Sequence, residues 1–111
     1  MSDSAYQREY PRVERILLTS VEQYNIDGEL AESRIGRTLN VSEGGILLEV
    51  DHPLPFLSKV SLNIAIKEDI IKADGEVVHL RRTKDGKIEM GIKFLDIPAD
   101  DRMILENHLT G

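Results

Sequence analysis

The sequence predicts a mainly β fold: a small six-stranded antiparallel β-barrel with one C-terminal α-helix. Hydrophobic residues make up 41% of the 111 residues, but aromatic residues make up only 5% and Trp is absent, so the core must consist mainly of Ile, Leu and Val. β-branched residues pack well in strands. Apolar and polar residues also alternate in several segments that end at turn signals. Closing the sheet into a barrel would remove the exposed strand edges.

The first half of the chain predicts three strands joined by turns. In the first strand, Ile16, Leu18 and Val21 are expected to face the core. Asp27-Gly28 is a hairpin signal, and the polar residues interleaved in the second strand predict one solvated face. These strands cover residues 13–23, 29–41 and 46–50, with a turn at 42–45.

The second half predicts three more strands and a helix. Strict alternation is clearest from Val60, and Gly75 marks a bulge or bend in the long fifth strand. Pro98 followed by acidic residues predicts a helix start. The predicted strands cover residues 60–67, 70–82 and 88–94; turns are expected at Glu68-Asp69 and Asp85-Gly86; the helix covers residues 98–109, with Ile104, Leu105, His108 and Leu109 on one face.

Size predicts a single domain. Residues 1–12 are expected to form a flexible N-terminal segment, and residues 13–111 the barrel domain. The N-terminus lacks the basic and apolar regions of a signal peptide, and no apolar run is long enough to span a bilayer. The absence of Cys excludes disulfides and thiolate chemistry. These features together predict a cytoplasmic protein without membrane insertion.

The net charge of −6 argues against binding to nucleic acid, because such proteins normally carry a basic surface. The first forty residues nevertheless contain five arginines and no lysine, whereas all six lysines come later. Arginine grips phosphate and guanine edges with a planar fork. For Arg15, Arg34 and Arg37 we expect pairing with surface carboxylates. The five arginines are Arg8, Arg12, Arg15, Arg34 and Arg37.

Arg8 and Arg12 flank Pro11 on a segment that Pro11 makes non-helical. Four extended residues span about 13 Å, so two guanidinium groups on a curved segment can bracket one compact dianion. Each fork also fits the O6 and N7 acceptors of guanine.

A second motif follows at residues 40–45, Asn-Val-Ser-Glu-Gly-Gly. Asn40 offers an amide to a base edge, and Ser42 favours a turn. Gly44 and Gly45 permit positive φ and close backbone approach, so that peptide N–H groups can face a ligand. The same residues also suit an ordinary turn, but the two motifs together predict a site for a phosphate or a purine.

These two motifs make the chain resemble the PilZ domain family, the bacterial receptor module for cyclic di-GMP. Arg8 to Arg12 fit the family's RxxxR motif, and Asn40 to Gly45 fit its (D/N)xSxxG motif. Gly91-Ile92-Lys93-Phe94 resembles a late-strand element of that barrel. The resemblance covers essentially the whole chain from Arg8 and implies a six-stranded barrel of the split-barrel type with a C-terminal helix.

The resemblance also implies roles for the matching residues. Arg8 and Arg12 would hold the guanines and phosphates of cyclic di-GMP, while Asn40, Ser42 and Gly45, with Gly44 beside them, would form the opposing wall. The ligand would tie the N-terminal segment to the barrel and create a surface for an unidentified protein of, for example, the motility or exopolysaccharide machinery. No metal or other cofactor is implied.

Three other functions compete with this interpretation of the sequence. An enzyme is disfavoured, because Cys is absent and His52, His79 and His108 show no metal-ligand spacing. A barrel that binds single-stranded nucleic acid would need stacked aromatic residues and a basic groove, and the aromatic residues here are scattered. A ligand-independent adaptor that binds a protein partner remains the main alternative.

Overall fold

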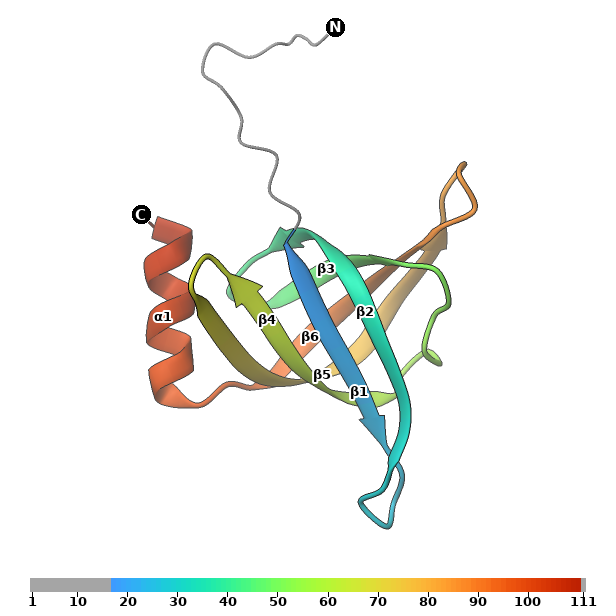
Figure 1. Ribbon diagram of the computed structural model, residues 1–111, viewed down its shortest axis with the longest axis horizontal. Helices are drawn as coiled ribbons and strands as arrows, with labels where there is room; N and C mark the ends of the chain where they lie inside the picture. The colour runs from blue at the N-terminus through green and yellow to red at the C-terminus, as the bar shows by residue number, and fades with distance from the viewer. Residues whose placement is uncertain (1–16, 111) are drawn as a thin grey trace, which may run out of the picture.

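Six strands with alternating aliphatic and polar side chains close into an antiparallel barrel in the computed structural model, which describes residues 17–110 (Figure 1). The order around the barrel is β1–β2–β3–β6–β5–β4, and β4 pairs with β1 to close it. The predicted barrel and helix are confirmed; the predicted flexible segment 1–12 and residues 13–16 lie outside the described range. The elements are β1 Leu18–Tyr24, β2 Leu30–Val41, β3 Gly45–Val50, β4 Lys59–Ile66, β5 Asp69–Arg82, β6 Ile88–Asp96 and α1 Ala99–Thr110.

The core is aliphatic, as the composition predicts. The inward positions of β4 follow the predicted period of two, and all four side chains are buried. Full burial of one such side chain contributes about 1.5–3 kcal/mol, so these residues stabilise the barrel strongly. In β6 the same alternation holds through Ile92, whereas Phe94 is only partly buried against the core. The buried β4 residues are Val60, Leu62, Ile64 and Ile66.

The inward face of β1 differs from the prediction. Thr19 and Val21 are fully buried, whereas Leu18 is 46% exposed, so the expectation that Leu18 faces the core was wrong. The hydroxyl groups of Thr19 and Thr38 lie 2.8 Å apart and hydrogen bond to each other. This pairing makes burial of a polar residue tolerable, because a buried hydroxyl is costly only when it has no partner.

Turns and bulges set the register of the long strands. The turn predicted at Glu68-Asp69 lies one residue earlier, because Asp69 already pairs with Ile66 and Lys67 takes the left-handed conformation at φ 55°. The predicted irregularity at Gly75 is confirmed as a register shift between Asp74 and Gly75 in the pairing of β5 with β6.

Helix α1 packs against β5 (Figure 1). It begins at Ala99, one residue later than predicted, because Pro98 caps it by accepting the Arg102 N–H at 2.9 Å. Leu105 is buried as expected, but Leu109 is 37% exposed and does not belong to the packed face. Within residues 17–110 no helix is long and apolar enough to cross a membrane.

Two polar contacts fix the helix on the barrel. The Asp101 carboxylate accepts the backbone N–H of Lys72 at 2.6 Å, and the His108 ring lies 3.1 Å from the Asp69 carboxylate. The two barrel residues in these contacts, Lys72 and Asp69, both belong to β5. The helix is therefore held at its first and last turns, with Leu105 between them.

We expect Leu105→Ala to lower the free energy of unfolding by about 2–5 kcal/mol, because it leaves a cavity between α1 and the barrel. Met103→Ala, on the same helix but 63% exposed, should cost less than about 0.5 kcal/mol. Urea unfolding of both variants measures the difference. Equal effects would show that α1 does not depend on this contact.

Candidate functional site

The second sequence motif forms the turn that joins β2 to β3. The Ser42 N–H donates to the Gly45 carbonyl at 2.9 Å and closes the turn. The Ser42 hydroxyl lies 3.2 Å from the Gly44 nitrogen, whose N–H it accepts, and 3.4 Å from the Gly45 carbonyl. The predicted turn is confirmed, and Ser42 supports its shape from within.

The two glycines act differently from the expectation. Neither Gly44 nor Gly45 has a positive φ; within residues 17–110 the glycines that do are Gly28 and Gly86. What Gly45 provides is close approach, since a Cβ atom there would lie 2.5 Å from the Ile92 carbonyl oxygen. A Cβ at Gly44 would meet nothing within 4 Å.

Strand β6 holds this turn in place. Gly45 pairs with Lys93, and the Phe94 N–H donates to the Gly44 carbonyl at 2.9 Å. Two residues earlier, Gly91 leaves room for His79, because a Cβ at position 91 would lie 2.9 Å from the His79 Cβ. The Gly-Ile-Lys-Phe element of β6 and the turn motif are therefore one structural unit.

Three of the predicted site residues line one shallow depression of about 170 Å³. Asn40, Ser42 and Gly45 lie on it, together with Ile46 and Leu47. Asn40 follows a register shift between β2 and β3, and its side chain is exposed. Gly44 does not line the depression, although it belongs to the same turn. The described surface therefore presents the Asn40 amide, the Ser42 hydroxyl and the Gly45 backbone.

Arg8 and Arg12 lie outside the described residues, but the described chain shows where the segment that carries them joins the barrel. The Leu17 carbonyl accepts the Thr38 N–H at 2.7 Å, and Leu18 pairs with Arg37. Residue 17 thus lies beside Thr38 of β2, and Thr38 is two positions before Asn40. The connection to the arginine motif is at the same end of β2 as the turn motif.

Arg34 and Arg37 pair with surface carboxylates, as expected, whereas Arg15 lies outside the described residues. Arg34 Nη1 lies 2.9 Å from a Glu32 carboxylate oxygen, and its Nε donates to the His52 carbonyl at 3.0 Å. Arg37 Nη2 lies 3.2 Å from Glu49. No cationic side chain from residues 17–110 lines the depression itself. Lys93, opposite Gly45 on β6, is an exposed neighbour to which the sequence assigned no role in the site.

The family model described as "PilZ domain" matches residues 6–111. The chain belongs to the PilZ domain family. The match includes both arginines of the first motif and the whole of the second.

Solved structures show the same fold in longer chains. The Bacillus subtilis inhibitor of motility (MotI/DgrA) superposes with a TM-score of 0.68 at 21% identity, over 92% of this chain and 49% of that one. K. pneumonia MrkH in its apo state superposes with a TM-score of 0.59 at 18% identity, over 94% of this chain and 51% of that one. This chain thus spans about half the length of each. No curated protein matches its sequence.

The two glycines of the turn allow a matched test of its packing. We expect Gly45→Ala to lower the free energy of unfolding by about 1–3 kcal/mol, because the new methyl group clashes with the β6 backbone. Gly44→Ala should stay within about 0.5 kcal/mol of the original protein, since its methyl group faces open space. Thermal unfolding of both variants measures this, and equal losses would contradict the assigned contact.

Proposed function

We propose that this PilZ domain is a receptor for cyclic di-GMP. The observation that carries the proposal is the position of the turn motif. Asn40, Ser42 and Gly45 share one exposed depression, and the chain leading to Arg8 and Arg12 meets the barrel beside Thr38. The segment that leads to Arg8 and Arg12 therefore starts at the end of the barrel that carries the turn motif, which supports a site built from both motifs.

The chemistry of the ligand fits the residues available. Cyclic di-GMP offers two anionic phosphates and two guanines. An arginine fork can bind a phosphate bidentately or the O6 and N7 atoms of a guanine. The exposed Asn40 amide supplies both a donor and an acceptor to a base or phosphate.

The size of the depression explains why both motifs are needed. Pockets that enclose a drug-sized molecule measure roughly 300–1,000 Å³, whereas this depression measures about 170 Å³. A cyclic dinucleotide would therefore rest on the turn without being enclosed by it. Since residues 17–110 place no cation on the depression, we expect Arg8 and Arg12 to supply most of the neutralising charge. These arginines would cover the ligand from the opposite side.

This arrangement implies a mechanism in which the ligand acts as a bridge. Charge-assisted hydrogen bonds join the arginines to the ligand, and the ligand rests on a turn that β6 holds rigidly. Binding would fix the N-terminal segment over the end of the barrel. The changed surface is then available to a protein partner, as in other switches that order a segment.

The proposal is tested by calorimetric titration with cyclic di-GMP, with GTP and the linear dinucleotide as competitors. We expect saturable binding that is selective for the cyclic form. Arg8→Ala with Arg12→Ala should weaken binding about 100-fold or more, because hydrogen bonds to charged groups contribute about 1.5–3 kcal/mol each.

Arg81→Ala with Arg82→Ala is the matched control, since it removes the same charge from the end of β5. This control should bind like the original protein. Absence of binding by the original protein, with no thermal stabilisation, would overturn the receptor proposal and favour the ligand-independent adaptor.

A second variant tests the barrel side of the site. Asn40→Ala should leave stability within about 0.5 kcal/mol, because the side chain is exposed. It should weaken cyclic di-GMP binding about 10-fold, the effect of losing one or two ordinary hydrogen bonds. Asn107→Ala removes the same amide side chain from α1, outside the site, and is the matched control. Unchanged affinity in Asn40→Ala would remove this residue from the site.

A further inference from the structure

The barrel also carries hollows that lie away from the turn motif. Two adjoining hollows of about 320 and 380 Å³ share Ser61, Asp74 and Asp96. They run over β4 and β5, and these strands lie across the barrel from β2 and β3. We call this combined surface the acidic groove and define it by Glu22, Tyr24, Ser61, Asp74, Leu95 and Asp96.

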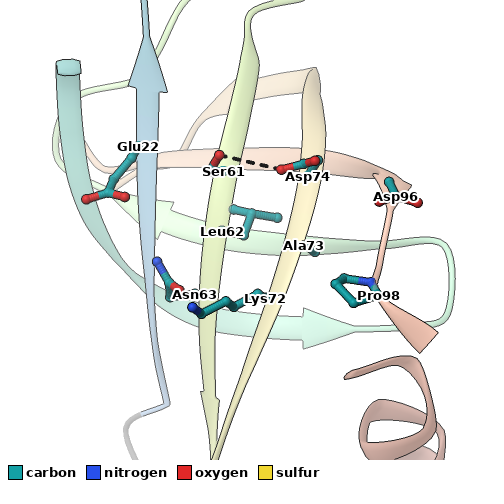
Figure 2. A pocket seen from close by; sticks show the side chains of 9 residues that line it. All are labelled: Glu22, Ser61, Leu62, Asn63, Lys72, Ala73, Asp74, Asp96 and Pro98. Carbon is teal, nitrogen blue, oxygen red and sulfur yellow. Dashed lines mark hydrogen bonds between the residues drawn. The ribbon is translucent and has the colours of Figure 1, made fainter. Parts of the chain in front are cut away.

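Strand register aligns the polar side chains of the groove in one row. Glu22 of β1 is opposite Ser61 of β4, Ser61 is opposite Asp74 of β5, and Asp74 is opposite Asp96 of β6. Figure 2 shows these four side chains in sequence across the sheet. With about 4.8 Å between neighbouring strands, the row extends about 14 Å. Three of its four members are carboxylates.

The carboxylates are poorly compensated within the described chain. Asp74 and Asp96 are directly opposite each other, and like charges in that position destabilise a sheet. Asp74 receives only a long contact of 3.5 Å from the Ser61 hydroxyl, and within residues 17–110 the Asp96 carboxylate has no hydrogen bond or ion pair. The charge of this row therefore remains available to an external group.

The nearby lysines do not neutralise the row. Lys59 pairs with Glu76 at 3.5 Å, in the neighbouring row of the sheet. Lys72 lies beside Asn63 at one end of the hollow of about 320 Å³, away from Asp96 (Figure 2). Both lysines line the hollows, so the groove is acidic along the middle row and carries one lysine on each side of that row.

Apolar groups flank the row. Tyr24 is 46% exposed and Leu95 is 45% exposed, and both line the second hollow beside Gly75. The Tyr24 hydroxyl donates to Glu22 at 3.1 Å, which joins the aromatic side chain to the first carboxylate of the row. The surface can therefore receive an apolar side chain next to a positively charged one.

A single metal ion does not fit this pattern. Among the described residues no three His, Asp or Glu side chains converge closely enough to hold a metal. The carboxylates are instead spaced strand by strand, so the complementary charges must be spaced too. Lysine or arginine side chains on an extended chain meet this requirement, because alternate residues project to the same face.

We propose that the acidic groove docks an extended segment of a partner protein that carries basic side chains and one apolar side chain on the same face, at alternate positions. This inference rests on the proposed receptor function, in which a partner reads the ligand-bound state. The basic side chains would lie along Glu22, Asp74 and Asp96, and an apolar side chain would pack on Tyr24 and Leu95. Complementary charge of this kind chiefly sets specificity and association rate.

The test is an amide NMR titration of the full chain with a short synthetic peptide that has lysines and one leucine at alternate positions and serine between them. The same peptide with glutamate in place of lysine is the control ligand. We expect shifts at Glu22, Tyr24, Ser61, Asp74 and Asp96 with the basic peptide only. Shifts elsewhere, or no binding by the basic peptide, would overturn the proposal.

Matched charge variants test whether the peptide is attracted by the groove or by the net negative charge of the whole protein. Asp74→Asn with Asp96→Asn should weaken peptide binding about tenfold. Glu68→Gln with Asp85→Asn removes the same charge from two exposed turns and should not weaken it. Equal weakening by both pairs would show general charge attraction and overturn the proposal.

Cyclic di-GMP titration of the Asp74→Asn, Asp96→Asn variant distinguishes the two hypotheses. Its affinity for the dinucleotide should be unchanged, because the acidic groove and the turn motif lie on different strands. Failure of peptide docking with intact dinucleotide binding would reject the groove alone. Failure of dinucleotide binding in the original protein would reject the receptor function itself.

Discussion

The candidate ligand surface depends on a backbone contact that leaves no space for a Cβ atom. Gly45 lies so close to the Ile92 carbonyl that any side chain there would clash, and the Phe94 N–H holds the neighbouring Gly44 carbonyl. Ile92 itself is buried in the core. The turn is therefore positioned by the packed interior of the barrel, and a site on such a rigid support needs little reorganisation to bind.

Strand β1 connects the turn motif with the acidic groove, the two proposed binding surfaces. Its start lies beside β2, next to the turn motif, and the segment that precedes it carries Arg8 and Arg12. Its end supplies Glu22 and Tyr24 to the acidic groove. In the proposed receptor, closure of the barrel would fix both the surface for the dinucleotide and the surface for a basic partner.

Local patterns in the sequence were sufficient for the barrel, the turn at 42–45 and the core of β4, since period two and turn residues act over short distances. Contacts between distant segments were not predictable in this way. The burial of Thr19 depends on Thr38 in another strand, and the need for Gly45 depends on β6. The acidic groove depends on the register of four strands and on the irregularity at Asp74 and Gly75.

The most direct measurement of the central claim is amide hydrogen exchange of the original protein with and without cyclic di-GMP. The account predicts that the ligand slows exchange in residues 8–12 and 40–45 together, because one molecule bridges both motifs. Exchange along the acidic groove should stay unchanged. Protection of residues 40–45 without residues 8–12, or protection confined to other strands, would contradict the account.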